Sequence, residues 1–352
     1  MEATAVRVLD QPAHWRPVAP WAAGFLLAAL GLQLSACTRE DGVKARGDGT
    51  ALSTPVVAPP WYEVVSHAPG PAVTDAEMRR RIEESGQPWR VRDLGTGIEM
   101  VLVMPGEFLM GSPEQELGRR ADEGPQHRVR LTRAFYLGAT EVTQAQWQHV
   151  TGASNGFFKG ETKPADGCWE DLQEFLSQAN AGLPLGVEQL RAPTEAEWEY
   201  ACRAGSSASF SFEGAPAHEV LNFNDGVVKS PYVDGRLKVV GGRMEVVWEK
   251  PPSRGCRMGT ADAGSLPPNA WGLHEMHGNL GEWTADKYSP DAYLNRGQVA
   301  VDPLEVAVGD DARTLRGGDW YKAAEYSRSA RREAGGVQTR SNRLGFRVAR
   351  TL

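Results

Sequence analysis

Cysteine is scarce in this sequence. Four occur among 352 residues, at Cys37, Cys168, Cys202 and Cys256, and none belongs to a C-x-x-C pair. The close pairing typical of zinc ribbons and thioredoxin-like redox motifs is therefore excluded. With Cys37 set aside, three thiols remain. The sequence leaves open whether they form one disulfide and a free thiol or stay as three buried thiols.

Positive charge is not in excess either. The 38 Lys and Arg residues are outnumbered by 45 Asp and Glu residues, which gives a formal net charge of -7. Binding to a phosphate backbone needs a basic face, so we expect no nucleic acid partner. The sequence also lacks a phosphate-binding loop, a nucleophile elbow and a dinucleotide fingerprint. The classes of function that depend on these motifs are not expected.

Long apolar runs are missing, with one exception near the start. Residues 18–36 contain no charged side chain and follow Arg16, which is the charged-then-apolar layout of an export signal. Leu34, Ser35 and Ala36 then lead into Cys37, and this sequence resembles the lipobox of bacterial lipoproteins. The alternative is an uncleaved transmembrane helix, for which 19 residues are barely enough.

The lipobox resemblance implies cleavage before Cys37 and acylation of its sulfur and amine. Several acyl chains make a firm anchor, because each buried CH₂ contributes about 0.8 kcal/mol. We therefore predict a lipoprotein signal peptide over residues 1–36 and a location in the bacterial cell envelope, with Cys37 as the lipid-bearing link to the membrane. The residue after Cys37 is Thr38 and not Asp. By resemblance to bacterial lipoproteins, this favours the outer membrane.

The segment behind the cysteine has the composition of a linker. Gly, Pro, Ser and Thr dominate up to about Pro71, which is typical of a flexible tether. Thr74 and Glu77 then form a capping-box pattern that predicts a short helix through Glu84. We predict a lipid-anchored tether with this helix over residues 37–87, and one folded domain over residues 88–352.

Periodic patterns are concentrated in the first half of that domain. They predict strands over 98–104, 108–111 and 127–131, and helices after Thr143, around 172–179 and from Thr194 to Gly205. After Gly205 short segments alternate with Gly, Pro and Asn, and there are no internal repeats. The sequence therefore predicts a single α+β domain with little regular secondary structure.

Eight short blocks of sequence carry a family resemblance. In order, they are Phe108-Leu-Met-Gly-Ser112, Glu141-Val-Thr143, Pro193-Thr-Glu-Ala-Glu-Trp-Glu-Tyr-Ala201, Pro268-Asn-Ala-Trp-Gly-Leu273, Met276-His-Gly-Asn279, Glu282-Trp283, Leu315-Arg-Gly-Gly318 and Gly345-Phe-Arg347. Residues 97–350 thereby resemble the formylglycine-generating enzyme family, also called the sulfatase-modifying factor family. The resemblance implies an irregular C-type-lectin-like fold, in which the tryptophans and arginines of these blocks mainly serve the scaffold.

The resemblance also implies a chemistry whose central residues are absent here. Family members oxidise a cysteine within a C-x-P-x-R peptide, using O₂ and copper held by two cysteines after the R-G-G motif. Those two positions hold Lys322 and Ser327. Thiolates suit Cu(I) because both are soft, whereas an ammonium group is a cation without a soft donor. Copper is therefore not expected as a cofactor.

Two further departures fall on the same region. Asp319 replaces the serine that usually follows R-G-G, and Gly281 replaces the tryptophan of the N-x-W-E-W block. No catalytic residue is assigned, and Gly281, Asp319, Lys322 and Ser327 mark the positions of the lost site. Because the scaffold blocks persist, we expect a domain that kept its fold without this chemistry.

Calcium is the cofactor that the resemblance still implies. Ca²⁺ needs hard oxygen ligands, and matching by residue assigns side-chain oxygens to Glu275 and Glu282 and carbonyl oxygens to Gly278 and Leu280. A second, weaker site would begin at Asn222 and Phe223, where the sequence then diverges through an insertion ending near Lys250. A zinc site at His274 and His277 is the alternative, but no third ligand is evident in the sequence.

These observations leave three functions to compare. The first is a binding or assembly module of the envelope, with an unidentified protein or ligand as its partner, because the scaffold and export address persist without the copper thiols. The second is a divergent protein-modifying oxidase, or an enzyme of other chemistry, that uses Asp319, Lys322 and Ser327. The third is a structural subunit of a larger envelope complex.

Overall fold

The computed structural model of the chain describes residues 61–71, 73–229, 255–294 and 296–352, together with short strands between 232 and 250. The predicted signal peptide over residues 1–36, Cys37 and residues 38–60 of the predicted tether lie outside the described residues. The chain divides into a larger unit, residues 58–231 and 246–352, and a smaller unit that includes residues 232–245. Among the described residues, no helix has the length and apolar character needed to cross a bilayer.

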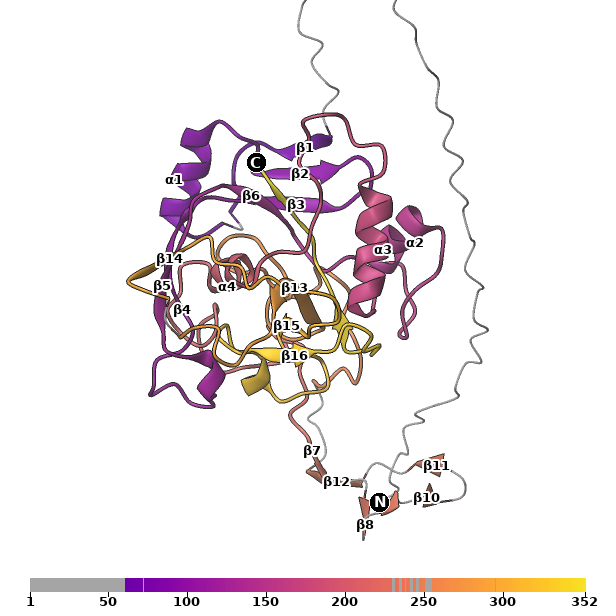
Figure 1. Cartoon of the computed structure of the whole chain (residues 1–352). Coiled ribbons are helices and arrows are strands. Elements are labelled where there is room, and N and C mark those ends of the chain that lie inside the picture. Colours follow the sequence, from indigo (N-terminus) through magenta and orange to yellow (C-terminus); the bar gives the residue numbers. More distant parts are fainter. Residues whose placement is uncertain are drawn as a thin grey trace, which may run out of the picture. The chain divides into compact units, whose positions relative to one another are not determined.

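Figure 1 shows the elements of both units. The larger unit contains, in chain order, β1 (Tyr62–Ser66), α1 (Ala76–Ser85), β2 (Arg90–Asp93), β3 (Glu99–Val103), β4 (Gly106–Met110), η1 (Ala121–Glu123), β5 (His127–Leu131), β6 (Phe135–Gly138), α2 (Gln144–Thr151), α3 (Trp169–Ala179), α4 (Glu195–Arg203), β7 (Val227–Lys229), β12 (Val247–Lys250), β13 (Gly281–Lys287), β14 (Val299–Val301), β15 (Arg313–Arg316), η2 (Ala324–Ser327), β16 (Glu333–Gly335), β17 (Leu344–Gly345) and β18 (Ala349–Thr351). The smaller unit contains β8 (Tyr232–Val233), β9 (Arg236–Leu237), β10 (Val239–Val240) and β11 (Arg243–Met244).

Three sheets organise the larger unit. The first has the strand order β1-β2-β3-β6-β18 and is antiparallel throughout. The second has the order β16-β15-β13-β17, in which β13 and β17 run parallel, and the third has the order β14-β5-β4. The strands predicted over 98–104, 108–111 and 127–131 are confirmed as β3, β4 and β5. The mixed α+β class is likewise confirmed.

The folded part begins earlier than the predicted boundary at residue 88. Strand β1 pairs with β2 along the edge of the first sheet, and Trp61 stacks on the guanidinium of Arg350 at 4.1 Å. In α1, Met78 and Ile82 are buried in the core. Treating residues 61–87 as tether was therefore wrong. The reason is that β1 has mostly exposed side chains, so its sequence lacks the apolar alternation that marks a strand.

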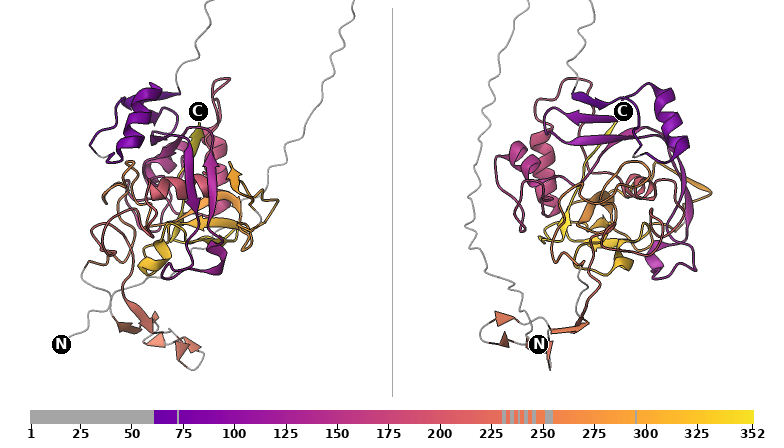
Figure 2. Two further views of the ribbon diagram at one scale, coloured as in Figure 1. Left: turned by 90° about the vertical axis from the view of Figure 1, so that its left-hand side faces the viewer. Right: turned by 180° about the vertical axis from the view of Figure 1, so that it is seen from behind.

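The helix predictions hold, with one correction at an end. Helix α1 is capped by Asp75, whose side chain accepts the N–H groups of Glu77 and Met78, and not by Thr74. Thr143 caps α2 in a full capping box with Gln146, as predicted. In Figures 1 and 2, α1 and the packed pair of α2 and α3 lie on opposite sides of the larger unit.

Helix α4 lies in the middle of the larger unit (Figure 1). Thr194 caps it in a second full capping box with Glu197, and Trp198 and Ala201 have no exposed surface. Two glutamates of this helix are also buried, Glu195 and Glu199. Buried carboxylates need charged partners, so the placement of α4 fixes where the arginines of the other strands must lie.

Those arginines come from sequence blocks far from α4. Arg316, at the end of β15, forms an ion pair with Glu199 and lies 3.6 Å from Glu195. Arg332 pairs with Glu195 at 2.6 Å. These fully buried pairs join α4 to the second sheet, which confirms the scaffold role predicted for Arg316.

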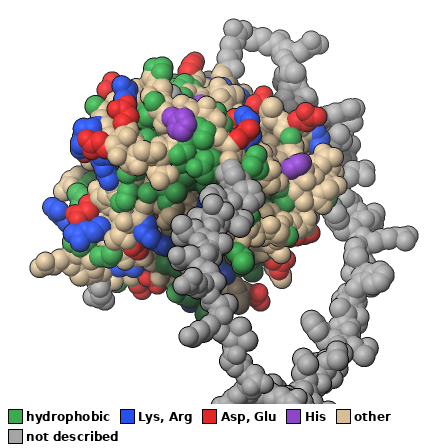
Figure 3. All heavy atoms as spheres, turned by 90° about the horizontal axis from the view of Figure 1, so that it is seen from above, with side chains coloured by type: hydrophobic (Ala, Val, Ile, Leu, Met, Phe, Trp, Pro, Cys, Tyr) green, Lys and Arg blue, Asp and Glu red, His purple; other side chains and the backbone are tan. Residues whose placement is uncertain are grey.

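One face of the larger unit is seen from above in Figure 3. Acidic and basic side chains lie next to one another there and do not form separate fields. On α1, for example, Arg80 pairs with Glu77 at 2.8 Å and with Glu84 at 2.7 Å. Exposed pairs of this kind contribute little to stability. They do keep this face from presenting charge of one sign.

Candidate functional site

Lys322 lies at the centre of an ion-pair cluster. Its ammonium group pairs with Glu333 of β16 and lies 3.3 Å from a carboxylate oxygen of Asp319. The positive φ angles of Gly317 and Gly318, 95° and 72°, turn the chain after β15 so that Asp319 faces Lys322. Glu333 therefore belongs to this site together with Asp319 and Lys322. Sequence reasoning missed it because it lies eleven residues beyond Lys322 in the chain.

Asp319 serves the turn as well as the lysine. One of its carboxylate oxygens accepts the backbone N–H of Tyr321 at 3.0 Å and that of Lys322 at 3.2 Å. Burial raises the pKa of Asp319, and the charge of Lys322 opposes this shift. The carboxylate is thus held by three groups of its own segment. This arrangement positions charge and leaves no soft donor for copper.

Ser327 is placed beside this cluster but is closed off from solvent. It ends η2, has no exposed surface, and its hydroxyl has no hydrogen-bond partner among the described residues. A Cβ atom at Gly318 would lie 2.5 Å from the Ser327 hydroxyl oxygen, so glycine is needed there. A hydroxyl without a neighbouring base is not activated as a nucleophile.

His277 lies beneath Ser327. Its Nδ1 is 2.7 Å from the backbone oxygen of Ser327, and its Nε2 accepts the hydroxyl of Ser211 at 2.8 Å. Burial lowers the pKa of His277 to about 4. Cys202 lies 3.7 Å from the same Nε2, and burial raises the pKa of its thiol to about 12. A neutral imidazole beside a protonated thiol is a core contact and not a reactive pair.

The zinc alternative finds no support in this geometry. His274 bonds to the backbone oxygen of Leu266 at 2.8 Å, whereas His277 contacts Ser211 and Ser327. Across the ranges that the structure describes, no group of three or more His, Cys, Asp or Glu side chains is arranged to hold a metal ion.

The three thiols of the described residues are free. Cys168 and Cys202 are buried and Cys256 is half-buried. Cys168 precedes α3 as its N-cap residue, while Cys256 contacts Met258 and the backbone oxygen of Phe223. Of the alternatives left open by the sequence, the disulfide with one free thiol is not observed, and of the three thiols expected to be buried Cys256 is only half-buried. No pair of thiols is seen next to Lys322 in the described part of the chain.

Gly281 begins β13, where it pairs with Leu344 of β17. A Cβ atom at this position would lie 3.2 Å from a methyl carbon of Leu344. The space next to the backbone is thus filled by Leu344. A large aromatic ring at position 281 would have to displace that side chain.

The carboxylates predicted to bind calcium are engaged within the protein. Both oxygens of Glu282 accept N–H groups of Arg347 at 2.7 Å, and one also accepts the indole N–H of Trp198 at 2.8 Å. The two oxygens of Glu275 accept the backbone N–H groups of Gly264 at 2.8 Å and Leu266 at 3.0 Å. Both oxygens of Glu275 and the Oε1 of Glu282 accept one of these bonds each and retain a lone pair, whereas the Oε2 of Glu282 accepts two.

The charge around these carboxylates favours a cation. Glu141 is buried beside them, and one of its oxygens has no hydrogen-bond partner among the described residues. Burial and the negative charges of Glu275 and Glu282 raise the pKa of Glu141 well above its ordinary value. Three carboxylates face one guanidinium, that of Arg347. Carboxylate oxygens are hard ligands of the kind that Ca²⁺ accepts, but no three carboxylates of the described residues are arranged to hold a metal ion.

The other predicted ligands lie close to this cluster. Gly278 forms a β-bridge with Asn222, and its N–H donates to Gly317 at 2.7 Å. The amide nitrogen of Asn222 donates to Asn279, while its amide oxygen is buried without a partner in the described residues. Leu280 has no exposed surface. The backbone oxygen of Phe223, predicted for the weaker site, accepts the Cys256 thiol at 3.6 Å.

Residues 90–352 match the model of a protein family described as the sulfatase-modifying factor enzyme 1-like domain. The chain belongs to this family. It is 32% identical over 166 residues to a formylglycine-generating enzyme of Mycobacterium tuberculosis, covering 45% of this chain and 50% of that protein. It is 29% identical over 291 residues to that of Streptomyces coelicolor, covering 69% of this chain and 86% of the relative. The chaperone protein LppX of Paenibacillus barcinonensis is 26% identical over 253 residues, covering 62% and 80%.

Solved structures confirm the fold of this sulfatase-modifying factor domain. PvdO from Pseudomonas aeruginosa has a TM-score of 0.59 at 27% identity and covers 75% of this chain and 98% of its own. The Treponema denticola variable protein 1 has a TM-score of 0.55 at 21% identity, covering 72% and 95%. The irregular α+β fold predicted from the blocks is therefore confirmed.

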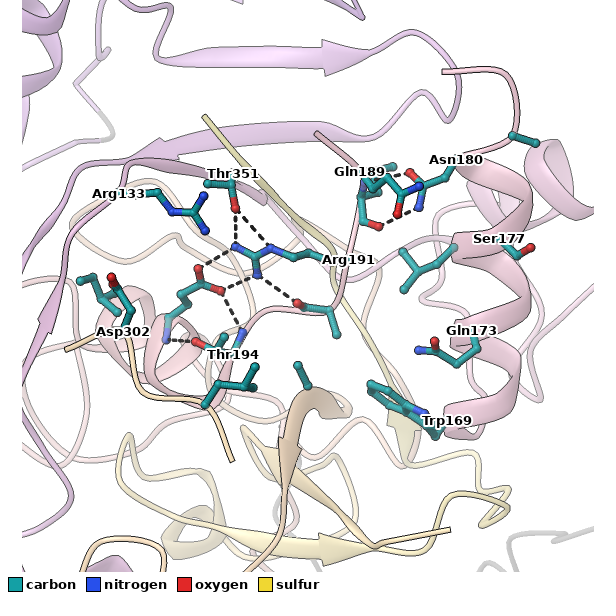
Figure 4. Close-up of a pocket in the computed structure, with 18 residues that line it drawn as sticks. Arg133, Trp169, Gln173, Ser177, Asn180, Gln189, Arg191, Thr194, Asp302 and Thr351 are labelled. Atoms are coloured by element: carbon teal, nitrogen blue, oxygen red, sulfur yellow. Dashed lines mark hydrogen bonds and ion pairs between the residues drawn. The ribbon is translucent and has the colours of Figure 1, made fainter. Parts of the chain in front are cut away.

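The sulfatase-modifying factor domain also has a cavity away from Lys322. Its volume is about 770 Å³, and its wall is formed by α3, the segment before α4 and the end of β18. Figure 4 shows that Arg191 bonds to Thr351 and that Arg133 and Gln173 border the same space. Sequence analysis missed this cavity, because its wall is assembled from distant segments.

Proposed function

We propose that this protein is a lipid-anchored envelope member of the sulfatase-modifying factor family that binds a partner and does not oxidise cysteine. The observation that carries the proposal is the ion-pair cluster of Lys322, Asp319 and Glu333, which occupies the positions around the family's copper thiols. A cluster in which one ammonium group holds two carboxylates offers Cu(I) no soft donor, and the ammonium group at its centre repels a metal cation.

Two relatives support a role without oxidation. One mouse relative, 26% identical over 221 residues, is named inactive C-alpha-formylglycine-generating enzyme 2. LppX is named a chaperone protein, which is a function of binding and assistance. Together with the lipobox at Cys37, these names support an assembly role at the envelope membrane, for which we propose the outer membrane.

The central test is an oxidation assay on the full chain. The protein is incubated with copper, O₂ and a C-x-P-x-R peptide, and aldehyde formation is measured by mass spectrometry. The formylglycine-generating enzyme of Streptomyces coelicolor serves as the positive control. We expect no conversion above a sample without protein. Turnover above that background would overturn the proposal.

The cavity provides the surface where we expect the partner to bind. Its volume of about 770 Å³ is suited to a side chain or a short segment of another molecule. A photo-crosslinking residue is placed at Gln173, beside the cavity, and in a second variant at Leu185, which is 99% exposed outside it. We expect a discrete adduct in intact cells from position 173 and none from 185. Equal labelling from both positions would argue against the cavity.

Relatives that are named formylglycine-generating enzymes favour a second function, a divergent protein-modifying oxidase. In that case Lys322 would act on the substrate directly. Replacing Lys322 by Ala, with stability and phenotype followed separately, distinguishes the two functions. An oxidase loses its phenotype while the variant remains folded, whereas a binding module keeps its phenotype as long as it folds.

A further inference from the structure

One face of helix α3 borders the cavity of about 770 Å³. This face consists of residues spaced i, i+4, i+7 and i+8, which are Trp169, Gln173, Leu176 and Ser177. Gln173 and Ser177 are exposed, and neither side chain forms a hydrogen bond within the part of the chain that the structure describes. An amide and a hydroxyl are therefore available to bond a molecule in the cavity.

These two polar side chains have the spacing of an extended polypeptide. Gln173 and Ser177 are four residues apart, which corresponds to about 6 Å along the helix axis. In an extended chain, the backbone groups that face one side recur at every second residue, about 6.6 Å apart. A strand-like segment that lies along α3 can thus present one backbone group to Gln173 and the next to Ser177. The spacing favours a peptide over a compact small molecule.

An arginine without a partner lies on the other side of the cavity. Figure 4 shows α3 on one side of the space and Arg133 on the opposite side. Arg133 is exposed, and its guanidinium makes no hydrogen bond or ion pair with the residues that the structure describes. The neighbouring Arg191 differs, because it pairs with Glu197 at 2.7 Å and bonds to Thr351 at 2.8 Å. The charge of Arg191 is matched within the protein, whereas that of Arg133 is available.

Asp302 borders the same space but is engaged elsewhere. One of its carboxylate oxygens accepts the backbone N–H of Thr132 at 2.8 Å, and the other accepts the hydroxyl of Thr132. These bonds fix the residue before Arg133 and so hold the segment that presents the guanidinium. A carboxylate brought into the cavity would complement Arg133, and guanidinium–carboxylate hydrogen bonds are among the stronger polar contacts of proteins.

We propose that the cavity binds an extended, acidic segment of a partner polypeptide. An Asp or Glu side chain of the partner pairs with Arg133, and the partner's backbone bonds to Gln173 and Ser177. An apolar side chain next to the acidic one packs against Leu176 and Leu190, which line the same space. This role rests on the proposed function, to which it adds the chemistry of the partner.

The first experiment selects phage-displayed random heptapeptides, which have no free carboxyl end, on the full chain carrying Cys37→Ala. We expect enrichment of sequences with an Asp or Glu beside apolar residues. The Arg133→Gln variant should not enrich them. Arg80→Gln is the matched control, because it removes an arginine of α1 that is 56% exposed and does not line the cavity. A selection without acidic sequences, or the same selection on Arg133→Gln, would overturn the inference.

The second experiment measures the pairing with Arg133 directly. The leading sequence is synthesised with blocked ends and a fluorescent label, and its Kd is measured by anisotropy. Replacing its acidic residue by the amide should weaken binding about tenfold, and so should Arg133→Gln. Both changes together should cost no more than either alone, because they remove the same contact. Losses that multiply would refute a direct pair.

The contacts of α3 are measured with the same peptide. Gln173→Ala and Ser177→Ala should each weaken its binding about threefold or more, because each removes one hydrogen bond. Gln178→Ala is the matched control, since this glutamine is exposed on the same helix and does not line the cavity. Equal affinity of all three variants and the parent chain would contradict a segment that lies along α3.

Failure of this inference can be told apart from failure of the proposed function. Conversion of the C-x-P-x-R peptide removes the proposed function, whatever the selection yields. A discrete adduct from position 173 without any preference for acidic peptides removes the acidic segment alone. Circular dichroism verifies that each variant is folded. If Arg133→Gln does not fold, the acid-to-amide replacement in the peptide decides, because it leaves the protein unchanged.

Discussion

At the scale of single residues, the region around Lys322 depends on which charged side chains form ion pairs with one another. Lys322 is 25% exposed along its side chain, while Asp319 and Glu333 are 2% and 23% exposed. The tyrosine ring of Tyr326 lies 5.6 Å below the ammonium group and 4.5 Å from the guanidinium of Arg331. Position 322 is thus a structural junction between the turn after β15 and the strand β16.

We predict that Lys322→Met destabilises the protein, because it removes the cation shared by Asp319 and Glu333, of which Glu333 keeps its ion pair with Arg331 at 3.2 Å. The expected loss in free energy of unfolding is about 1–3 kcal/mol, measured by urea denaturation. Lys322→Arg should recover part of this loss. The control is Lys159→Met, at an exposed lysine without an ion pair among the described residues, which should change stability by under about 0.5 kcal/mol. Equal stability of Lys322→Met and wild type would contradict the junction.

His277 gives a prediction about pH. Burial lowers its pKa to about 4 in the folded state, whereas an unfolded chain has a histidine pKa of about 6.5. Between these values the unfolded state binds more protons, so the contribution of His277 to stability rises with pH and is complete above about 6.5. The stability difference between wild type and His277→Gln should therefore grow from pH 4 to 6.5, by a few kcal/mol at most. A difference independent of pH would refute this.

At the scale of elements, helix α4 determines how the site is held. It carries Glu195 and Glu199 to Arg332 and Arg316, and its Trp198 donates to Glu282 of β13. One helix thereby connects the second sheet to the predicted calcium cluster. An element with so many buried polar partners must be fixed at its start.

We predict that Thr194→Ala lowers the free energy of unfolding by about 1 kcal/mol, because it removes the cap of α4. The Thr194 hydroxyl accepts the N–H of Glu197 at 3.1 Å, and Ala cannot replace that acceptor. Thr194→Ser keeps an oxygen at the same place and is the matched control. Chemical denaturation monitored by tryptophan fluorescence gives both values. If Ser and Ala are equally destabilising, the cap is not responsible.

At the scale of the whole molecule, the excess of carboxylates around Arg347 leads to a proposal about calcium. An ion that binds the folded state alone stabilises it by about 2.7 kcal/mol at one hundred times its Kd. We predict that calcium raises the Tm of the protein relative to a sample with chelator. Glu275→Gln should abolish the increase, whereas Glu170→Gln, at an exposed position, should preserve it. Identical Tm values with calcium and with chelator would contradict calcium binding by the folded protein.

Much of the scaffold was predictable from local sequence. Capping boxes at Thr143 and Thr194 involve residues three apart, so the sequence contains both partners of each hydrogen bond. The apolar stripe of α3, with Leu172 and Phe175, is local in the same way. Strand β1 escaped prediction because its pairing with β2 depends on backbone hydrogen bonds, which any sequence can make.

The sequence alone determined the family blocks and the absence of thiols at positions 322 and 327, since both are matters of residue identity. Only the tertiary structure decided that Glu333 pairs with Lys322 and that Arg347 holds Glu282. The physical reason is that charge compensation and metal coordination depend on distances of a few ångströms. Residues far apart in the chain reach such distances only after the sheets and α4 have packed.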